Sequence, residues 1–529
     1  MMGNKKLQVW LPLLFSLVLI VGMFLGYKLN NTGKSNMFSS NRRSSLQEAL
    51  DLIRLKYVDS VVIDSLEGKA IEEMMSELDP HSVYLPPVDL KEANEELAGN
   101  FQGIGVEFNV FNDTVNIIYV IPEGPSDRSG LRIGDKIIKV NDSTIAGKAL
   151  STDDIKNYIR GMGGSKAVLQ IVRGKEIQSI TVTRGKIPVS SIDAGYMASP
   201  ATGYIKLNKF TDKSYEEFME TLEALKKEGL KNLVLDLRGN GGGFMNEAVD
   251  MADEFLDGDK LVVYMQGVNI KKREYRCKRP GLLEDGKLMV LVDELSASAS
   301  EVLAGSLQDW CRATIIGRRT FGKGLVQDQY ALSDGAAIRL TIARYYTPLG
   351  RSIQRSYEKG KKIYMDELWD RFSSGEMFSV DSVRNHNKGK KFLSVCNDTL
   401  YDGDGITPDI FVPADSILYQ NKLGRWLSGN RLGNYVYNYY LQHTAEISRY
   451  RSSADYNANF PANQLWDGFV QKSTGDSLNV NSLSNREKLL LQLRLKGMLA
   501  RYRWRNSGFY EVINADDAAI KKALETIGK

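Results

Sequence analysis

The sequence predicts a multidomain protein of mixed α/β class, on three observations. The chain has 529 residues, which is more than one simple domain usually holds. Short apolar runs separated by turn residues fill residues 103–183, as in a compact β-rich unit. From about residue 186, apolar strand patterns alternate with helical patterns, as in an α/β core, and the chain after residue 414 is mostly helical in pattern.

The composition is that of an ordinary folded protein, with 43% hydrophobic and 25% charged residues. The net charge of +4 is small for this length, and Lys and Arg are spread among acidic residues, so we expect no nucleic-acid partner. The three cysteines, Cys277, Cys311 and Cys396, show no metal-binding spacing. One disulfide among them is an open alternative, but we expect at least two unpaired thiols.

The N-terminus carries a membrane signal. Lys5 and Lys6 precede an apolar run over residues 9–26, about 18 residues, which is long enough to span a bilayer as a helix. No Ala-x-Ala-like cleavage site follows it, so we expect residues 1–27 to be an uncleaved transmembrane signal-anchor, with a cleaved signal peptide as the alternative. Lysines on both sides of the run leave its orientation undecided. We place the rest of the chain outside the cytoplasm because a lone N-terminal anchor often directs export.

Residues 28–97 are predicted to form a linker and an N-terminal helical region. The linker, over residues 30–44, is rich in Ser and Asn. Apolar spacing and proline positions then predict three helices, over residues 46–57, 62–78 and 90–97.

Residues 98–185 are predicted to form the β-rich unit. Its expected strands and helices, in chain order, are a strand at 103–108, a strand at 115–120, a short helix at 124–130, a strand at 136–140, a helix at 152–160, and strands at 168–172 and 180–183. Ser151 or Thr152 supplies the N-cap of the longer helix.

Residues 186–413 are predicted to form the α/β core. Its clearest expected elements are strands at 232–237, 288–292 and 313–316 and helices at 244–255 and 298–310. The highly charged stretch 356–400 has no clear period, and we interpret it as an insertion. Residues 414–529 are expected to be a mostly helical C-terminal extension with a leucine-rich apolar stripe.

A serine cluster at residues 296–301 (SASASE) carries the clearest chemical signal. Lys323 follows Ser298 by 25 residues, and Gln327 follows Lys323 by four. The chain has three histidines, and none lies near this cluster in sequence. A serine nucleophile here would therefore use lysine as its base. Lysine acts as a base only when neutral, which at its ordinary pKa of about 10.4 holds for roughly one molecule in a thousand near pH 7.5, so the site must lower that pKa by burial.

The residues around Lys323 suit this task. Phe321, Leu325 and Val326 are apolar neighbours that would desolvate the amine. The amide oxygen of Gln327 would orient the amine without adding a negative charge that raises its pKa.

Two backbone features would stabilise a developing oxyanion. The helix that begins near Ser298 presents free N–H groups at its first turn. The triple glycine at 241–243 follows a core strand and leaves its backbone N–H groups uncovered. One of these glycines and Ala299 would supply the two donors of an oxyanion hole.

Taken singly, each feature has an ordinary explanation. Serines at helix starts are mostly caps, and the triple glycine lacks the spacing of a phosphate-binding loop. Glu301 and Asp309 are expected to be ordinary residues of a helix surface. His81 is expected to be structural.

The combined pattern resembles the carboxy-terminal processing (tail-specific) protease family, serine peptidase family S41. The matching motifs occur in family order at residues 78–85, 103–106, 235–243, 296–301, 317–327, 345–354 and 405–410. The resemblance implies that Ser298 is the nucleophile, Lys323 the general base and Gln327 its orienting partner. It also implies that Gly243 and Ala299 form the oxyanion hole, with no metal and no cofactor.

The resemblance further implies a ClpP/crotonase-like protease core at 186–413 with an inserted PDZ domain at 98–185. In this PDZ domain the loop of Gly103, Ile104, Gly105 and Val106 would receive a substrate's C-terminal carboxylate through backbone N–H groups. Two departures stand out. About 50 residues separate the last two motifs, which lie close together in many members, and the chain after residue 413 lies outside the match.

These observations favour an envelope serine endopeptidase, anchored in the inner membrane of a bacterium with its catalytic body in the periplasm. Its partners would be proteins with apolar or unfolded C-termini and the membrane, and a homodimer through the N-terminal helices stays open. A catalytically inactive PDZ scaffold is the alternative, which the intact Ser298, Lys323 and Gln327 disfavour. An esterase or amidase of small molecules would have little use for a PDZ domain.

Overall fold

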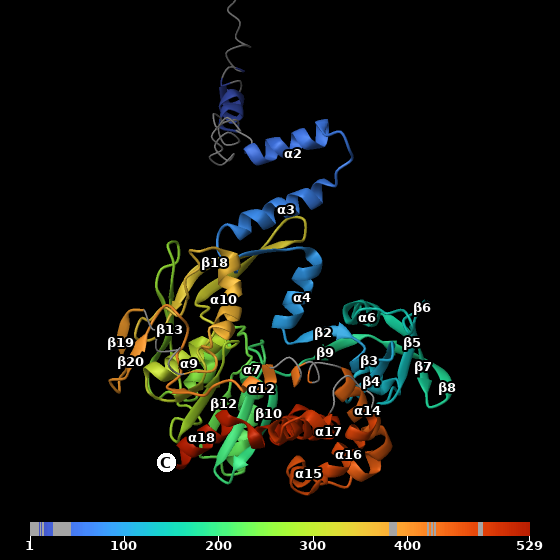
Figure 1. Ribbon diagram of the computed structural model, residues 1–529. Coiled ribbons are helices and arrows are strands. Elements are labelled where there is room, and N and C mark those ends of the chain that lie inside the picture. The colour runs from blue at the N-terminus through green and yellow to red at the C-terminus, as the bar shows by residue number, and fades with distance from the viewer. Residues whose placement is uncertain are drawn as a thin grey trace, which may run out of the picture. The chain divides into compact units, whose positions relative to one another are not determined.

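The computed structural model of the chain describes residues 10, 12, 15–24, 44–379, 389–419, 423–424, 427, 430–473 and 480–529. By its internal contacts the chain divides into two units, Met1–Glu73 and Met74–Lys529. Figure 1 shows the helices and strands with their labels.

The first unit contains α2 (Ser45–Lys56) and most of α3 (Ile63–Ser76), so the helices predicted at 46–57 and 62–78 are confirmed to within two residues at each end. Ser44 caps α2 by accepting a hydrogen bond from the Gln47 N–H. Of the predicted anchor at 9–26, the positions other than 10, 12 and 15–24 lie outside the described residues. None of the helices in the described part of the chain is both long enough and apolar enough to cross a membrane.

The second unit opens with β1 (Val83–Leu85) and α4 (Pro87–Leu97), and then enters the β-rich domain. Helix α4 starts three residues before the predicted helix at 90–97, because Pro87 fits the first turn of a helix, where no N–H is needed. The strand β2 (Asn100–Gly103) pairs with β9 (Gly185–Pro188), so the chain enters and leaves the domain through one antiparallel ribbon.

The β-rich domain is an antiparallel sheet in the order β3-β4-β5-β7-β8, with β6 paired to β5. Its strands and helices are β3 (Val106–Phe111), β4 (Thr114–Val120), α5 (Pro125–Arg128), β5 (Lys136–Val140), β6 (Ser143–Thr144), α6 (Thr152–Ile159), β7 (Lys166–Arg173) and β8 (Glu176–Thr183). The single strand predicted at 103–108 is wrong. Gly105 adopts a φ of 79°, which breaks the strand between β2 and β3.

The core of the unit is a six-stranded sheet in the order β10-β11-β12-β15-β16-β21. Its strands are β10 (Ile192–Ser199), β11 (Thr202–Leu207), β12 (Asn232–Asp236), β15 (Leu288–Val292), β16 (Thr314–Gly317) and β21 (Ile410–Phe411). All pairs are parallel except β10 with β11. The helices α7 (Ser214–Lys227), α8 (Met245–Asp253) and α9 (Ala299–Asp309) pack on it through a large apolar core. The predicted α/β multidomain class is confirmed.

A second core sheet carries one side of the site. It has the order β1-β18-β13-β14, with β17 also paired to β18. The strands not yet given are β13 (Leu261–Gln266), β14 (Arg273–Arg276), β17 (Leu325–Ala331) and β18 (Ala337–Tyr346). Lys323 stands two residues before β17, and Gln327 lies within it.

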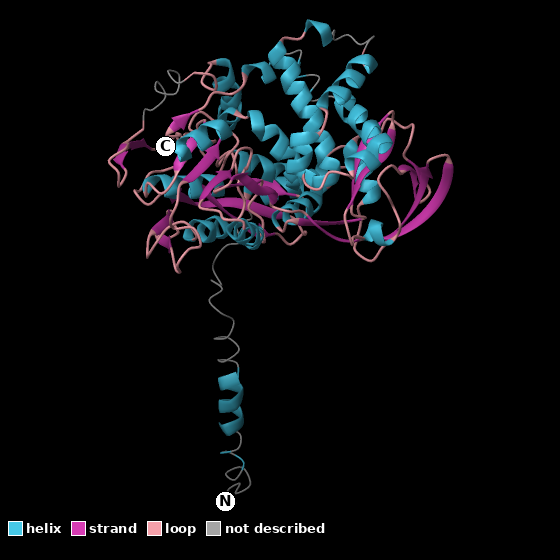
Figure 2. Cartoon of the chain, turned by 90° about the horizontal axis from the view of Figure 1, so that it is seen from below, coloured by secondary structure: helices cyan, strands magenta, loops and turns pink. Residues whose placement is uncertain are grey.

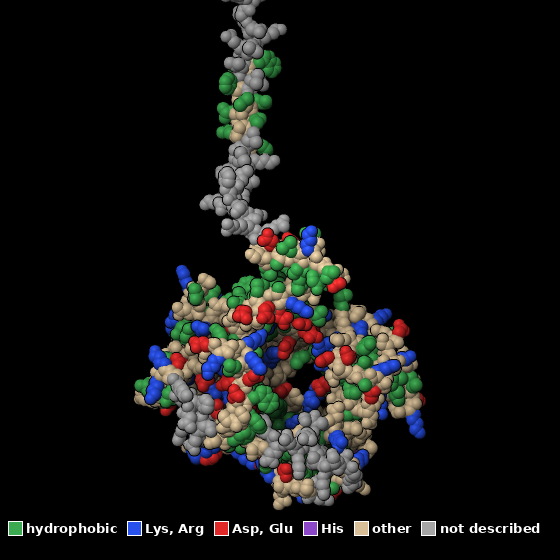
Figure 3. Space-filling view, turned by 45° about the horizontal axis from the view of Figure 1, so that its top comes forward, with side chains coloured by type: hydrophobic (Ala, Val, Ile, Leu, Met, Phe, Trp, Pro, Cys, Tyr) green, Lys and Arg blue, Asp and Glu red, His purple; other side chains and the backbone are tan. Residues whose placement is uncertain are grey.

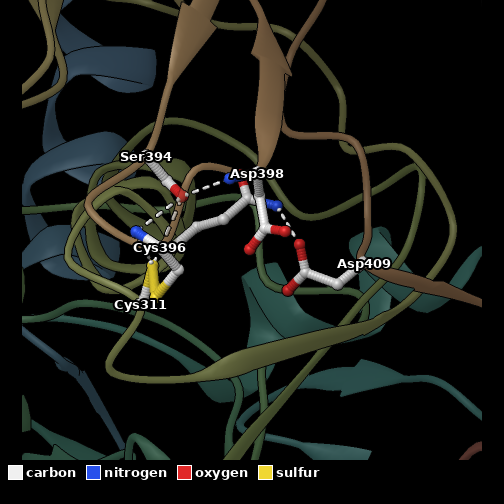
Figure 4. Close-up of a disulfide and its surroundings, with 6 residues drawn as sticks. Cys311, Ser394, Cys396, Asp398 and Asp409 are labelled. Carbon is white, nitrogen blue, oxygen red and sulfur yellow. Dashed lines mark hydrogen bonds between the residues drawn. A yellow bond between two sulfur atoms is a disulfide. The ribbon is translucent and has the colours of Figure 1, made fainter.

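The charged stretch 356–400 contains α10 (Lys361–Ser373) and a hairpin of β19 (Lys391–Leu393) and β20 (Thr399–Tyr401), while residues 380–388 lie outside the described residues. A disulfide joins Cys311, just after α9, to Cys396 in this hairpin (Figure 4). The expectation of at least two unpaired thiols is therefore wrong, since Cys277 alone is free and it is buried. The paired cysteines are 85 residues apart, a separation that local sequence patterns do not reach.

The C-terminal extension is helical, as predicted. Its helices are α12 (Ser416–Tyr419), α14 (Asn430–Ile447), α15 (Ser453–Asn459), α16 (Ala462–Lys472), α17 (Asn485–Ile513) and α18 (Ala518–Gly528). Figure 2 distinguishes the helices of the chain from its strands by colour. Helix α17 contacts β10 of the core. On the face drawn in Figure 3, Lys and Arg side chains are intermingled with Asp and Glu side chains.

The extension also contacts the β-rich domain. Arg501 and Arg505 of α17 both pair with Glu107 of β3, and the Arg505 guanidinium lies 3.4 Å from the centre of the Tyr119 ring. Arg505 has a φ of 58° inside α17, which turns its side chain out of the regular helical path. The extension therefore joins the β-rich domain to the core, since Asn506, the next residue, donates a hydrogen bond to Asp193 at the start of β10.

Candidate active site

A cavity of about 540 Å³ brings together the residues that the sequence singled out. Ser298, Lys323, Gln327 and the glycine loop 241–243 line it. Its other lining residues are Ala93, Glu96, Leu97, Asn208, Lys209, Gly239, Phe244, Leu325, Arg339 and Tyr345. The core sheet, the second core sheet and α4 thus each supply one wall.

Ser298 stands at the N-cap position of α9 in a strained conformation. Its φ and ψ are 55° and −113°, a region that residues other than glycine rarely adopt, at a cost of about 1–3 kcal/mol. The Ser298 N–H donates to the carboxylate of Glu301 at 2.9 Å, and this bond helps to hold the strained residue. Such strain is concentrated at functional sites.

The hydroxyl groups of the other two serines of the cluster donate hydrogen bonds to backbone carbonyls. The hydroxyl of Ser296 donates to the Leu237 carbonyl at 2.9 Å, and that of Ser300 donates to the Asn240 carbonyl at 2.9 Å. Both side chains are fully buried, whereas Ser298 is half-buried and lines the cavity. The geometry therefore singles out Ser298 within the cluster.

The glycine loop approaches Ser298 closely. A Cβ on Gly242 would lie 2.7 Å from the Ala297 carbonyl oxygen and 2.8 Å from the Ser298 Cβ, and one on Gly243 would lie 1.9 Å from the Phe210 carbonyl oxygen. Among the residues that the structure describes, no acceptor takes the N–H of Gly243 or that of Ala299. These are the two donors that the sequence proposes for an oxyanion hole.

Lys323 is positioned by Gln327. The Lys323 Nζ donates to the Gln327 Oε1 at 3.0 Å, and the Gln327 Nε2 donates to the His81 carbonyl oxygen. Burial lowers the pKa of Lys323, and the nearby Arg339 guanidinium lowers it further, against smaller opposing effects of Glu301 and Asp79. A lowered pKa increases the neutral fraction of the amine at neutral pH, which is the form that accepts a proton.

The expectation that Glu301 lies on a helix surface is wrong. Its side chain is fully buried, and its carboxylate accepts from the Thr320 hydroxyl at 2.5 Å, from the Gly322 and Lys323 N–H groups at 2.7 and 2.8 Å, and from the Ser298 N–H. Burial raises the pKa of Glu301, and these four donors oppose the shift. One carboxylate thus fixes the backbone on both the serine and the lysine sides.

Asp309 is likewise buried, not exposed as expected. Its carboxylate pairs with Arg351 at 2.6 Å and accepts from the Leu349 N–H at 2.9 Å. Asp309 ends α9, eleven residues after Ser298, so this pair anchors the far end of the helix that carries the serine.

Replacing Glu301 by glutamine should weaken both the fold and the reaction. The amide offers one acceptor atom where the carboxylate offers two, so it leaves at least one buried donor unsatisfied, at a cost of about 1–3 kcal/mol. We expect a lower free energy of unfolding in urea titrations and a reduced kcat. A variant with wild-type stability and wild-type kcat would contradict this role of Glu301.

His81 lies behind the site. Its ring contacts Phe321 and Tyr364, and burial lowers its pKa to about 3, helped by the nearby charge of Lys323. The imidazole is therefore neutral at physiological pH. Its known link to the site is the backbone carbonyl that binds Gln327.

The loop proposed to bind a carboxylate lies between β2 and β3. The carbonyl groups of Ile104 and Gly105 accept from Ser126 and Ile121 at 2.9 and 3.1 Å. In the described part of the chain, the N–H groups of Ile104 and Gly105 have no acceptor. The strand β3 that follows is an edge strand, paired with β4 alone in its sheet.

Cys311, Cys396 and Asp398 also place their donor atoms within 4.8 Å of one another. Cysteine binds metal as a thiolate, and both sulfur atoms here are joined in the disulfide. These residues do not fit a metal site in the oxidised chain.

Comparison with known proteins identifies the family. The profile of Peptidase family S41 matches residues 201–360. The Probable CtpA-like serine protease of Staphylococcus aureus (strain N315) is 35% identical over 356 residues, which are 67% of this chain and 69% of that protein. The chain belongs to the S41 family of serine peptidases. The corresponding protein of Staphylococcus haemolyticus is 31% identical over 374 residues, 69% of this chain and 74% of that protein.

This S41 peptidase contains a PDZ domain, whose profile matches residues 117–173. Residues 424–505 match a family of unknown function, within the C-terminal extension. Among solved structures, the photosystem II D1 C-terminal processing protease is 26% identical with a TM-score of 0.38, covering 70% of this chain and 86% of that one. The peptide complex of the PDZ domain of a carboxy-terminal protease from Vibrio cholerae is 30% identical with a TM-score of 0.16, covering 17% of this chain and 99% of that one.

Proposed function

We propose that this S41 peptidase is an endopeptidase of the cell envelope that engages the C-termini of proteins through its PDZ domain and cleaves peptide bonds through an acyl-enzyme on Ser298. The observation that carries the proposal is the cavity that brings together a strained serine, a lysine of lowered pKa and Gly243. Among the described residues, no acceptor takes the N–H of Gly243 or that of Ala299, which directly follows the serine.

In the first step the Ser298 Oγ attacks the carbonyl carbon of the substrate while the neutral Lys323 Nζ takes the hydroxyl proton. The carbonyl oxygen becomes an oxyanion, which the N–H groups of Gly243 and Ala299 stabilise. The carbon–nitrogen bond then breaks, and Lys323 returns its proton to the leaving amine. This leaves an ester between Ser298 and the N-terminal part of the substrate.

In the second step Lys323 takes a proton from water, and the water oxygen attacks the ester carbon. Collapse of the intermediate releases the carboxylic acid and restores the Ser298 hydroxyl with the Lys323 proton. Gln327 holds the Nζ through both steps without adding a charge. The cycle needs no metal and no cofactor.

The PDZ domain would select the substrate. The N–H groups of Ile104 and Gly105, next to Gly103 and Val106, have no acceptor in the described part of the chain, which supports capture of a C-terminal carboxylate. The strand β3 pairs with β4 alone in its sheet, which supports addition of the peptide as a further strand. A strand added to an edge must be extended, so substrates with unfolded, apolar C-termini suit this surface.

The proposed place of action is the periplasmic side of the inner membrane, with residues 9–26 as the anchor. The disulfide between Cys311 and Cys396 supports an oxidising compartment, because reduced thiols prevail in the cytosol.

A matched pair of peptides tests substrate capture. The two share one sequence with an apolar C-terminus and differ only in a free carboxylate or a C-terminal amide. The amide lacks the charge that the loop N–H groups bind, a contribution of about 1.5–3 kcal/mol, so its KM should be about tenfold to a hundredfold higher at similar kcat.

Equal cleavage of both peptides would contradict carboxylate recognition. Binding of the carboxylate form with no cleavage of either peptide would instead favour the inactive PDZ scaffold.

A further inference from the structure

The insertion helix α10 packs against the segment that leads to Lys323. The Arg371 guanidinium donates to the Thr320 carbonyl at 2.7 Å and to the Phe321 carbonyl at 3.4 Å. Glu367, one turn earlier on α10, pairs with Arg371 and with Arg319. The insertion is therefore part of the wall around the base.

Tyr364 of α10 is also buried in this wall. It is 3% exposed, and its hydroxyl lies 2.9 Å from the His81 Nε2 and 3.4 Å from the Gln354 Nε2. Its ring meets the Phe321 ring edge-on at 6.0 Å, and the Arg355 guanidinium lies 3.9 Å from its centre. His81 lies 283 residues from Tyr364 in sequence, whereas Gln354 lies ten residues before it, in the segment that leads into α10.

Each of these partners leads to Lys323. His81 accepts the Gln327 amide on its backbone carbonyl, and Gln327 in turn binds the Lys323 Nζ. Gln354 accepts the Gly324 N–H on its Oε1 at 2.9 Å. The hydroxyl of Tyr364 thus links two short paths that end on the side chain of Lys323 and on the residue after it.

We propose that Tyr364 is a positioning residue for the Lys323–Gln327 pair, and that the insertion helps through Tyr364 to hold Lys323 in place. The proposal rests on the proposed function, since it assumes that Lys323 is the general base. Tyr364 does not line the cavity, so it acts through His81 and Gln354.

The direction of the hydrogen bonds follows from the donors present. The Gln354 Nε2 donates to the phenol oxygen, so the one proton of the phenol is free for the His81 Nε2. The lowered pKa of His81 keeps the ring neutral, able to accept this proton at Nε2 while its own proton stays on Nδ1. Burial raises the pKa of Tyr364, which keeps the phenol protonated.

Three charged residues shift the pKa of Lys323: Arg339 from β18, Glu301 from α9, and Asp79 in the segment before β1, beside the neutral His81. Lys209 and Glu96, paired with each other, line the same cavity. The Tyr364 hydroxyl adds no charge to this set. Its loss should affect Lys323 through position and hydration only.

The test is Tyr364→Phe, which removes the hydroxyl and keeps the ring that packs on Phe321 and Arg355. We expect kcat to fall about tenfold to a hundredfold with KM unchanged. We also expect the acid limb of the kcat–pH profile to move to higher pH, because a loosened Gln327 admits water to Lys323 and its pKa rises toward the ordinary value.

Tyr357→Phe is the matched control. Its hydroxyl accepts a hydrogen bond from Arg344 at 3.2 Å on the surface of the same insertion, and its loss should leave kcat and the pH profile unchanged. Wild type and Tyr357→Phe must both cleave, and failure of both would overturn the proposed function itself.

Wild-type kcat and an unshifted pH limb in folded Tyr364→Phe would overturn the positioning role, as would a fall in thermal stability with no change in kcat. If Tyr364→Phe fails to fold, His81→Leu removes the same hydrogen bond from its other end. The same fall in kcat and shift in pH limb would then support the proposal, and their absence would overturn it.

Discussion

Replacing Ser298 by alanine is expected to abolish peptide-bond cleavage and leave the fold intact. Without the Oγ no acyl-enzyme forms, and the rate should fall at least about 10⁴-fold. Alanine keeps the backbone N–H that donates to Glu301 and meets the same positive φ as serine, so the free energy of unfolding should change little. Fragment release from an unfolded reporter protein, measured by mass spectrometry, and thermal melting give the two readouts.

Ser300→Ala is the matched control from the same cluster. Its hydroxyl is bonded to the Asn240 carbonyl, so its loss should cost about 0.5–1.5 kcal/mol of stability and spare turnover below the melting temperature. Retained turnover in Ser298→Ala would refute the assignment of the nucleophile. If Ser300→Ala were at the same time folded but inactive, Ser300 would be the nucleophile instead.

Replacing Lys323 by arginine should be nearly as severe. The guanidinium is of similar length but stays protonated at every accessible pH, so it cannot take the proton of Ser298. Loss of general-base catalysis of this kind costs about 10²–10⁴-fold in rate. The kcat on the same reporter protein measures it.

Lys209→Arg is the control for that substitution. Lys209 lines the same cavity and pairs with Glu96, a partner that arginine also suits. We expect its kcat to stay near that of wild type. Wild-type turnover by Lys323→Arg would show that a charged side chain suffices at this position and would remove lysine as the base.

The sequence singled out four residues that line one cavity, Ser298, Lys323, Gln327 and Gly243, because they lie where local patterns are informative. Gly243 follows β12, and Ser298 follows β15, two neighbouring parallel strands whose carboxyl ends meet at one edge of the sheet. Apolar strands of this kind are easily located, and two predicted strands, 136–140 and 288–292, match β5 and β15 at both ends. Lys323 stands two residues before β17, and Gln327 lies within that strand.

The burial of charged side chains was the main feature that the sequence did not predict. Glu301 and Asp309 look like exposed helix residues because their partners, Thr320 and Arg351, come from distant segments. A signal for Glu301 was present in the sequence: an acid three residues after a serine at a helix start is the pattern of a capping box. Nothing comparable marks Asp309.

The structure of the insertion could not be predicted from the sequence either. Its charged stretch has no period, so no local rule reveals that Tyr364 is buried or that Arg371 binds the backbone before Lys323. The disulfide between Cys311 and Cys396 could not be predicted for the same reason, because the pairing of distant cysteines depends on the tertiary fold. In the PDZ domain the sequence predicted one strand across Gly105. The positive φ of Gly105 instead breaks the chain into two strands there.

The central claim is that Lys323 is neutral near physiological pH and takes the proton of Ser298. The most direct measurement is the rate at which a fluorophosphonate phosphonylates Ser298, with loss of fluoride, as a function of pH, in wild type and in Lys323→Arg. Because burial lowers the pKa of Lys323, the wild-type rate should rise with pH and level off below lysine's ordinary pKa of about 10.4. Lys323→Arg should react slowly and without this rise. A wild-type rate that keeps rising to pH 10.4, or a variant with the same profile, would contradict the claim.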